Sequence, residues 1–338
     1  MRHSFALLIL SVCFTLAASD ISLSGAASLG VLYHDMSVSL NDSVYVYDED
    51  IQRHGKLTTD IAISPLSGIT LRTDLAFDID DEALHMGTFD VRFSLGGGRQ
   101  IRAGYMKKRL SFEERLSHDE RQLIDRSILH ERIRSFHLPG RDFTLAYRHR
   151  RDNRTYWHAV AADMSHRYSM IHRLEWELAS SLEASSSLTV THGSKSPDSV
   201  HVITGNMALN YDQAAHRGEI EIMGGTNPSA ERIQRQMNEE MRILYGGIRL
   251  CYSYGFQRPE EYILETIRPI VEGVYLLDNH ETGKTSLQFR PGLSVGIIDA
   301  DIAELLISGD FQYGTLPPHH GEYTRRISGG AVRVRIRW

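Results

Sequence analysis

The chain has 338 residues, 24% of them charged, and a formal net charge of −6, so it offers no basic domain for nucleic acid. Beyond the first 19 residues it keeps one cysteine, Cys251, which excludes an intramolecular disulfide and a cysteine-based metal site. The same part of the chain lacks a run of about 18 apolar residues, so no membrane-spanning helix is predicted.

The first 19 residues have the pattern of a secretory signal peptide. Arg2 and His3 make a short positive start, an apolar run follows from Phe5, and small residues at positions 17–19 offer a cleavage site. The apolar run is too short to cross a bilayer comfortably as a helix. We therefore expect the signal to be removed after export, leaving residues 20–338 as the mature chain. A retained anchor is the alternative.

Beyond the signal, long runs alternate between apolar and polar residues. In residues 69–80 most odd positions are apolar, whereas the even positions include Arg72, Asp74 and Asp78. Alternation also occurs in soluble antiparallel sheets. These runs approach ten residues, longer than the five or six usual in soluble strands, and they carry full charges in mid-strand. Both features are typical of a transmembrane β-barrel with a water-filled lumen.

The strands expected from this pattern number about sixteen, an even count that suits a bacterial barrel. They span residues 42–49, 56–64, 69–79, 86–95, 99–107, 140–150, 155–165, 170–181, 186–193, 199–210, 215–224, 242–256, 268–277, 285–297, 302–313 and 329–338. Short turns such as 96–98 alternate with longer outer connections such as 225–241. The segment 257–267 is long where a short turn is expected, so counts of fourteen or eighteen stay open.

The segment from Lys107 to Gly140 is the third outer connection and does not alternate. Its apolar residues are spaced as in one or two short helices, with Ser117 as a candidate cap. It is dense in lysine and arginine. Arginine side chains bind oxyanions through paired hydrogen bonds. These lysines and arginines include Lys107, Lys108, Arg109, Arg115, Arg121, Arg126 and Arg132. One interpretation is a solvated loop laced with salt bridges; the other is a set of arginines that line a constriction and select anions.

The last strand is the sharpest local pattern. Apolar residues at every second position, ending in an aromatic residue, resemble the insertion signal of outer-membrane barrels. These residues are Val332, Val334, Ile336 and Trp338. The intervening residues, together with arginines of earlier strands, fall on the expected lumen face. This basic set comprises Arg72, Arg92, Arg102, Arg333, Arg335 and Arg337.

Residues 104–127 resemble the phosphate-selective porin O/P family. The resemblance lies in Gly104 and Lys107 at a strand end, in Glu113 four residues before Ser117, and in the acidic-Arg-Ser triplet 125–127. A weaker similarity covers 271–283. Asp125 replaces the family's Glu, Ile124 its Phe and Arg109 its Pro.

This resemblance implies an all-β, sixteen-strand antiparallel outer-membrane barrel whose third outer loop, 107–140, folds inward and narrows the pore. It further implies a homotrimer in the lipid and lipopolysaccharide of a Gram-negative outer membrane, placed there by the barrel-assembly machinery. The solutes would be small anions such as phosphate, passing by diffusion and without a cofactor.

Two alternatives to an anion channel stay open. The first is a general or sugar-type porin without anion selectivity; the second is a barrel enzyme or adhesin. No catalytic motif favours an enzyme, since the glycines of 96–98 are not followed by the Lys and Ser/Thr of a phosphate loop. His319 and His320 have no nearby ligand pattern, so no metal site is predicted. Assignments to lumen or lipid depend on strand parity, which a one-residue slip reverses.

Overall fold

The structure is a computed structural model. The residues it describes are 20–40, 43–78, 83–108, 110–115, 122–123, 126–136, 140–163, 167–193, 200–228, 230–231, 242–257, 264–297, 303–315 and 323–337.

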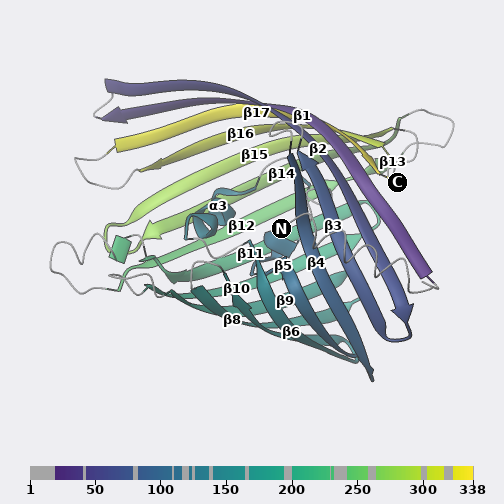
Figure 1. The fold of residues 1–338 in the computed structure, drawn as a ribbon. Helices are drawn as coiled ribbons and strands as arrows, with labels where there is room; N and C mark the ends of the chain where they lie inside the picture. The colour runs from purple at the N-terminus through teal and green to yellow at the C-terminus, as the bar shows by residue number, and fades with distance from the viewer. Residues whose placement is uncertain are drawn as a thin grey trace.

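These residues form seventeen β-segments and two short helices, shown in Figure 1. In chain order they are β1 (Asp20–Leu40), β2 (Ser43–Leu66), β3 (Ile69–Asp78), β4 (Ala83–Gly96), β5 (Arg99–Lys107), α2 (Phe112–Arg115), α3 (Ile128–Ser135), β6 (Arg141–Arg151), β7 (Arg154–Ala162), β8 (Arg167–Ala179), β9 (Leu182–Gly193), β10 (Val200–Gln213), β11 (His216–Thr226), β12 (Leu244–Tyr254), β13 (Phe256–Gln257), β14 (Leu264–Asn279), β15 (Lys284–Ile297), β16 (Ala303–Thr315) and β17 (Tyr323–Arg337).

The strands close into a single antiparallel barrel. Each strand pairs with its neighbours along the chain, and β1 pairs with β17 over fifteen residue pairs from Ala26–Arg337 to Leu40–Tyr323. The segments β12 and β13 lie on either side of Gly255 and both pair with β14, so they fill one place in the wall. Counting them as one strand gives sixteen, as the sequence predicts.

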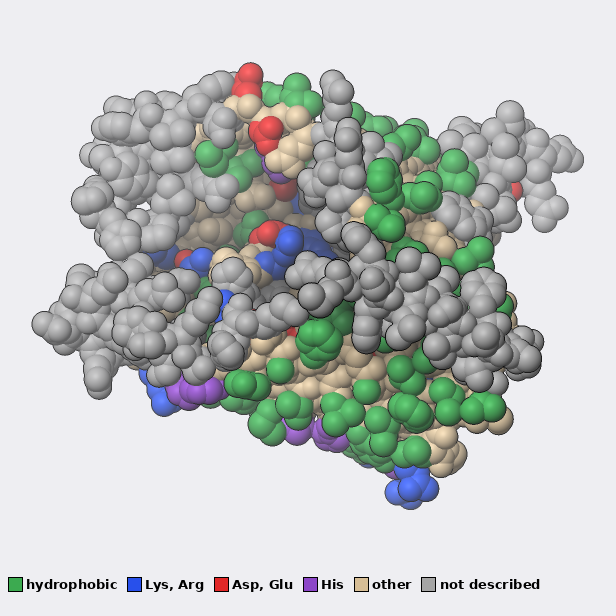
Figure 2. Space-filling view, viewed as in Figure 1, with side chains coloured by type: hydrophobic (Ala, Val, Ile, Leu, Met, Phe, Trp, Pro, Cys, Tyr) green, Lys and Arg blue, Asp and Glu red, His purple; other side chains and the backbone are tan. Residues whose placement is uncertain are grey.

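The alternating pattern divides the barrel wall into two faces. On β17 the side chains of Val332, Val334 and Ile336 point outward and are 45–49% exposed, whereas Arg333 and Arg335 point inward and are buried. The same parity holds around the barrel. Figure 2 shows many hydrophobic side chains on the visible outer wall, and charged groups in the opening and along the lower rim. None of the described helices is long and apolar enough to cross a membrane.

The first two predicted strands are wrong in their boundaries. The predicted strands 42–49 and 56–64 both fall within one strand, β2, which begins at Ser43, and β1 precedes it; residue 42 lies outside the described residues. β2 was divided because Asp48, Glu49 and Asp50 interrupt its apolar alternation, and β1 was missed because its middle, 25–28, consists of small residues. The error leaves the count at sixteen, and from β3 onward the strands follow the predicted order.

The β2–β3 and β4–β5 turns lie at one end of the barrel. At the opposite end, the β5–β6 connection is still the third in chain order.

The β2–β3 and β4–β5 turns need glycines with positive φ, among them Gly68 (φ 83°), Gly97 (φ 58°) and Gly98 (φ 73°). Such angles are open to glycine at little cost, and they let the chain reverse within two residues.

A close approach between β4 and β5 also requires glycine. Gly104 has φ 149°, and a Cβ atom there would lie 2.1 Å from the carbonyl oxygen of Phe89. Replacing Gly104 with Ala should therefore destabilise the barrel by about 2 kcal/mol or more. The check is the folded fraction after refolding into lipid vesicles, read from gel mobility before and after heating.

Gly205 provides the matched control for this substitution. It is also in a strand, but the nearest atom to an added Cβ, the Ser187 carbonyl oxygen, is 4.0 Å away. Gly205→Ala should refold like the parent protein. Equal refolding of the Gly104 and Gly205 variants would contradict this account of the β4–β5 contact.

Candidate functional site

The connection between β5 and β6, residues 108–140 and here called the β5–β6 segment, makes polar contacts with the inward face of the barrel. The backbone NH of Phe112 donates to Glu221 Oε1 at 2.8 Å, and that of Ile128 donates to Gln288 Oε1 at 2.9 Å. Gln122 Nε2 donates to Glu219 Oε1 at 2.9 Å. The acceptors belong to β11 and β15, so the described part of the segment lies against this side of the wall.

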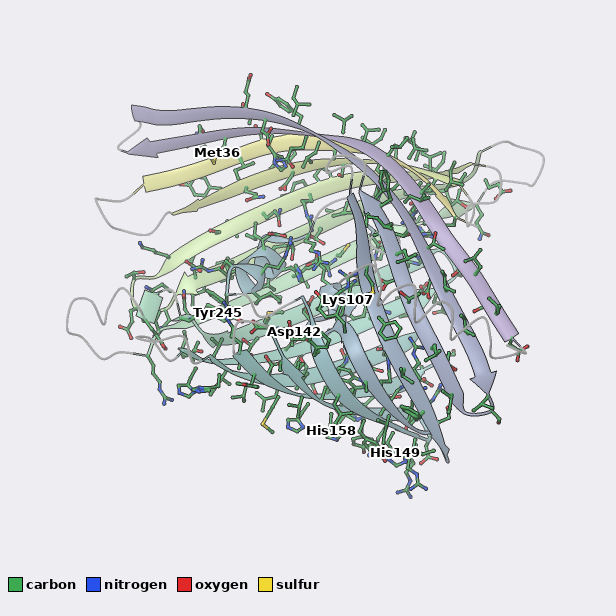
Figure 3. The ribbon with its side chains drawn as sticks, in the orientation of Figure 1. Met36, Lys107, Asp142, His149, His158 and Tyr245 are labelled. Carbon is green, nitrogen blue, oxygen red and sulfur yellow. The ribbon has the colours of Figure 1, made fainter. Side chains whose placement is uncertain are left out.

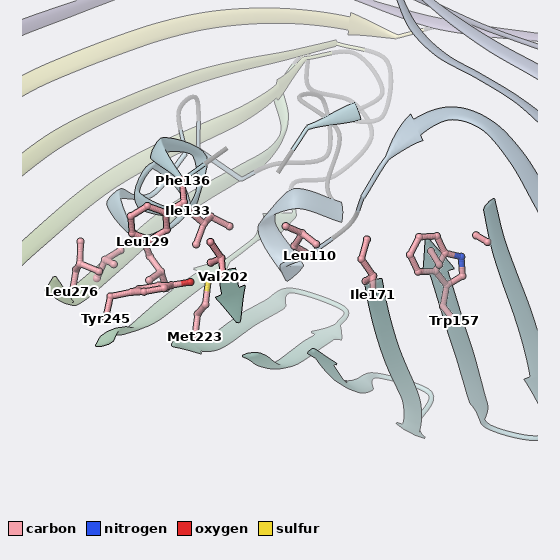
Figure 4. Packing of buried hydrophobic residues seen from close by; sticks show 13 residues of the cluster. Leu110, Leu129, Ile133, Phe136, Trp157, Ile171, Val202, Met223, Tyr245 and Leu276 are labelled. Atoms are coloured by element: carbon pink, nitrogen blue, oxygen red, sulfur yellow. The ribbon is translucent and has the colours of Figure 1, made fainter. Parts of the chain in front are cut away.

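Apolar packing holds the same residues in place. Leu129, Ile133 and Phe136 are buried against inward-facing side chains, and the Phe136 ring meets the Tyr245 ring edge-on at 5.2 Å between centroids. Figure 4 shows this cluster. Its members come from the segment and from β6, β7, β8, β10, β11, β12 and β14: Leu110, Leu129, Ile133, Phe136, Ala146, Trp157, Ala159, Ile171, Val202, Met223, Tyr245, Val274 and Leu276.

A second apolar cluster holds the segment's middle. Leu123 is buried with residues of β1, β12, β14, β16 and β17, namely Leu32, Cys251, Ile270, Leu306 and Ala331. A Cβ on Gly292 of β15 would lie 2.7 Å from Leu123 Cδ2, so glycine at that position makes room for the leucine. The described parts of the segment therefore contact inward-facing residues on many of the strands around the barrel.

The two helices of the segment are joined by one carboxylate. Glu113 of α2 accepts hydrogen bonds from the Ser127 backbone NH at 2.9 Å and from Ser127 Oγ at 2.6 Å. Ser127 is the N-cap of α3, and its Oγ also accepts from the His130 NH at 3.3 Å. Glu113 thus binds and orients the residue that begins α3. The predicted cap, Ser117, lies outside the described residues.

Glu113 stays ionised because of the charges around it. Burial would raise the pKa of its carboxyl, but the positive charges of Arg249 and Arg290 and the hydrogen bond from Ser127 lower it to about 2. The buried negative charge is therefore matched by cations of the barrel wall.

The inward face of β11–β15 carries a network of paired charges. Arg249 lies between Glu219 and Glu272, with N–O distances of 2.8 and 2.7 Å. Arg290 Nε donates to the same Glu272 at 2.8 Å, and Gln288 Nε2 donates to Asp310 at 3.0 Å. The two arginines here are fully engaged with carboxylates in a buried setting. Their main effect is to fix the wall on which the β5–β6 segment rests.

The inward face of β2–β5 differs, because its arginines are less deeply buried. Arg92 Nε and Arg102 Nη2 share Asp90, at 2.8 and 2.9 Å, and Arg72 Nε donates to Asp60 at 2.8 Å. Arg92 lies directly opposite Arg102 in the strand pairing, and Arg72 lies opposite Asp90. We call Arg72, Arg92 and Arg102 the arginine cluster. Asp74 of β3 lies opposite Asp60 and 3.6 Å from Arg141, so the three arginines share this face with three aspartates.

The arginine cluster is also open to solvent. The side chain of Arg72 is 37% exposed and that of Arg92 is 21% exposed, whereas Arg102 is 10% exposed. The mutual repulsion of the three cations lowers the stability of their arrangement, and Asp60 and Asp90 offset it. On the closing strand, Arg335 pairs with Glu304, and Arg333 is buried on the same face.

The cations of the segment do not form one site. Lys107 ends β5 on the face of Tyr105, which points outward, whereas Lys108 is buried and pairs with Asp142 at 2.7 Å. Arg126 contacts His130, and Arg132 Nη2 donates to Asp278 Oδ2 at 2.7 Å. Lys107 and Asp142 are labelled in Figure 3. Arg109 and Arg121 lie outside the described residues, as do Trp338 and the His319–His320 pair; Arg115 is described only in its backbone.

A cavity of about 560 Å³ lies between the segment and the wall formed by β1, β2 and β14–β17. Cations from the segment and acids from the wall meet across it. Its polar lining includes His34, Arg126, Arg132, Asp278, Asp310 and Gln312. The cavity is therefore suited to small polar solutes. Sequence analysis missed Asp278 and His34, which no local motif marks, because strands distant along the chain bring them to the segment.

A scan against protein-family models and a search of curated proteins found no match. Solved structures do match. An anion-selective porin from Comamonas acidovorans superposes with a TM-score of 0.64 at 11% identity, covering 94% of this chain and 99% of that one. The chain has a porin fold. The outer-membrane channel DcaP of Acinetobacter baumannii gives 0.64 at 10%, covering 95% and 98%. The trimer form of OmpT from Vibrio cholerae gives 0.58 at 11%, covering 94% and 99%.

Loss of the Glu113 charge should loosen the β5–β6 segment of this porin-like barrel. Glu113→Gln removes the charge that Arg249 and Arg290 face, and we expect it to cost about 2–4 kcal/mol of unfolding free energy. Glu131→Gln is the control, since the Glu131–Arg134 pair is exposed and should contribute under about 1 kcal/mol. Urea unfolding of both variants in lipid vesicles measures the difference. Equal midpoints would contradict the role given to Glu113.

The effect of Glu113→Gln should depend on pH. Since the pKa of Glu113 is about 2 in the folded protein, below its ordinary value of 4.5, the ionised carboxylate stabilises the fold above pH 4.5. That contribution is lost as the pH falls toward 2. The stability gap between parent and variant should therefore be full at pH 6 and shrink at pH 3. A gap that widens on acidification would contradict the assigned charge state.

Proposed function

We propose that this protein is a passive channel of a Gram-negative outer membrane that lets small hydrophilic solutes diffuse, with a preference for anions such as phosphate. The arginine cluster on the inward face of β2–β5 carries the proposal, because the guanidinium groups of Arg72 and Arg92 are partly exposed there. Residues 1–19 would direct export and be cleaved. The barrel itself needs no cofactor and performs no chemistry.

The β5–β6 segment is the part that narrows this channel. Its described residues contact the inward faces of β11 and β15, and its two apolar clusters draw on most of the strands. A segment held in this way leaves passage for solutes beside it, along the cavity lined by Arg126 and Arg132. Hydrophilic lining and a fixed constriction together favour small solutes over large ones.

Anion preference is supported by the unequal exposure of the inward arginines. On β11–β15, Arg249 and Arg290 are bound to Glu219 and Glu272 beneath the segment, so few of those charges face a solute. On β2–β5, Arg72 and Arg92 are partly exposed, so their charges can face a solute. Guanidinium groups bind phosphate-type oxyanions through paired hydrogen bonds. The anion-selective porin of Comamonas acidovorans shows that such a fold can support this preference in another protein.

The residues shared with the phosphate-selective porin O/P family support a common loop structure. Glu113 and Ser127, both within the resembling stretch, are hydrogen-bonded to each other and set the start of α3. This contact explains why an acid and a serine would be retained at that spacing in a loop of this kind. Phosphate as the solute rests on the arginines rather than on these two residues.

The partners of the channel follow from its location. The outward apolar face suits the lipid and lipopolysaccharide of the outer membrane, and Val332, Val334 and Ile336 would guide recognition by the barrel-assembly machinery. A homotrimer is the assembly we propose, as in the trimer form of OmpT. A general or sugar-type porin is the alternative that the following measurement separates.

Purified protein in planar bilayers should conduct steadily and show an anion-selective reversal potential under a potassium chloride gradient. Phosphate should reduce the chloride current, because it would occupy the arginine sites more tightly than chloride does. Arg126→Ala should weaken that reduction. Steady conductance with a cation-selective or neutral potential would remove the anion preference, and no conductance at all would contradict the channel.

Within the arginine cluster, Arg92→Gln tests the selectivity directly. Loss of one unit charge near the solute path should lower the anion-to-cation permeability ratio by about fivefold, the effect of about 1 kcal/mol at short range in water. Arg151→Gln is the control, since Arg151 is 78% exposed at the β6–β7 turn, outside the lumen. Equal ratios for both variants would show that the cluster does not set selectivity.

A further inference from the structure

The outward face of β6–β9 is largely apolar between the strand ends. Exposed aliphatic and aromatic side chains cover it, as expected of a wall in contact with hydrocarbon. These are Phe143, Leu145, Val160, Tyr168, Met170, Leu188 and Val190. Among them lie two histidines, His158 of β7 and His172 of β8, directly opposite each other in the strand pairing. Figure 3 shows His158 on the outside of this wall.

The two histidines lie at mid-height of the wall. β7 runs from Arg154 to Ala162, so His158 is its central residue. On the outward face the next pairs along the strands are Val160–Met170 on one side and Tyr156–Leu174 on the other. The Nδ1 atoms of the two imidazoles are 2.8 Å apart and the ring centroids 5.0 Å apart. The pair is therefore an island of polar groups within an apolar band.

This position is unfavourable against lipid chains. Each imidazole has two ring nitrogens, and the hydrogen bond between the Nδ1 atoms satisfies one of them. Among the residues that the structure describes, neither Nε2 atom has a hydrogen-bond partner. Hydrocarbon offers none, and polar groups exposed to it at this depth are strongly disfavoured. A protein surface can supply the missing partners.

Other outward histidines differ, because they lie near strand ends. His192 is next to the last residue of β9, His201 is the second residue of β10, and His216 is the first residue of β11. At these heights aromatic girdles and lipid headgroups accommodate polar rings. His158 of β7 and its partner His172 of β8 lie in mid-strand, too far from the strand ends for that explanation.

The strands are short over part of this wall, although β8 and β9 have 13 and 12 residues. β6 and β7 have 11 and 9 residues, whereas β1 and β2 have 21 and 24. The barrel is therefore low at β6–β7 and tall across the β1–β2 side. A low wall lets an identical barrel approach closely without collision between long strand ends.

We propose that the outward face of β6–β9 is the surface on which copies of this chain pack against one another in the membrane. A second copy fits better than a lipid surface, because it can both bury the apolar side chains and hydrogen-bond the His158–His172 pair. Soluble and membrane oligomers of identical chains close most readily through cyclic symmetry. The inference rests on the proposed membrane location and assigns a place to the proposed homotrimer.

Two cysteine variants of the full mature chain test the placement. Val160→Cys lies beside the histidine pair, and Phe289→Cys lies on the outward face of β15; the native side chains are 53% and 50% exposed. Both proteins keep Cys251, which is buried inside the barrel and is common to both. Each is refolded into phosphatidylcholine vesicles, treated with a short bis-maleimide cross-linker, and analysed by denaturing gel.

A second measurement on the same proteins reports lipid contact. Each cysteine is labelled with a bimane fluorophore, and quenching by dibrominated phosphatidylcholine is compared with quenching in ordinary phosphatidylcholine. We expect cross-linked copies and weak quenching at position 160, and strong quenching without cross-linking at position 289. Met170→Cys and Phe311→Cys, 53% and 50% exposed in the native side chains, replace the pair if either variant fails to fold.

Strong quenching and no cross-linking at position 160 would overturn the proposal. A trimeric mass combined with strong quenching at position 160 would also overturn it, since the copies would then meet elsewhere. Planar-bilayer conductance of the same preparations keeps the two claims apart. Conductance with a lipid-exposed position 160 contradicts only the interface, whereas cross-linking without conductance contradicts only the channel.

Discussion

The structure depends on one constraint, that every backbone NH and CO group inside hydrocarbon must be paired within the protein. The β1–β17 ladder meets it by joining the first and last strands over fifteen residue pairs, so the wall has no free edge. Closure then fixes the two faces. On β17 the valines and isoleucine turn outward while Arg333 and Arg335 turn inward, and the same parity places Arg249 and Arg92 in the lumen. Function follows from what the inward face carries.

The inward charges are divided into two sets with different tasks. Around Glu272, the ion pairs of Arg249 and Arg290 form the wall beneath the β5–β6 segment, and Glu113 adds a charge from the segment side. Buried pairs of this kind contribute little net stability, but removing one partner is costly, so they fix a single arrangement. In the arginine cluster of β2–β5, the side chains of Arg72 and Arg92 are partly exposed to solvent. The proposed anion channel rests on these two features, a segment bound to one side of the barrel and partly exposed arginines on another.

The sequence predicted the barrel, its strand count and most strand positions, because alternation is a local property. It failed where alternation fails: Asp48 to Asp50 interrupt β2, and the small residues 25–28 weaken β1. The alternation of polar and apolar residues placed Arg72, Arg92 and Arg102 on one face. It could not show that Asp60 and Asp90 are their partners, because the pairing of the strands decides which side chains meet. Lys107 was expected in the pore but lies on the face of Tyr105, and Lys108 is buried against Asp142.

The central claim is that water and small anions pass through this barrel beside the β5–β6 segment. Liposome swelling tests it most directly, with purified protein in vesicles and solutes of equal size but different charge. The account predicts fast swelling with a small anionic solute, slower swelling with a neutral one and slowest with a cationic one. Vesicles that swell no faster than protein-free controls, whatever the solute, would contradict it.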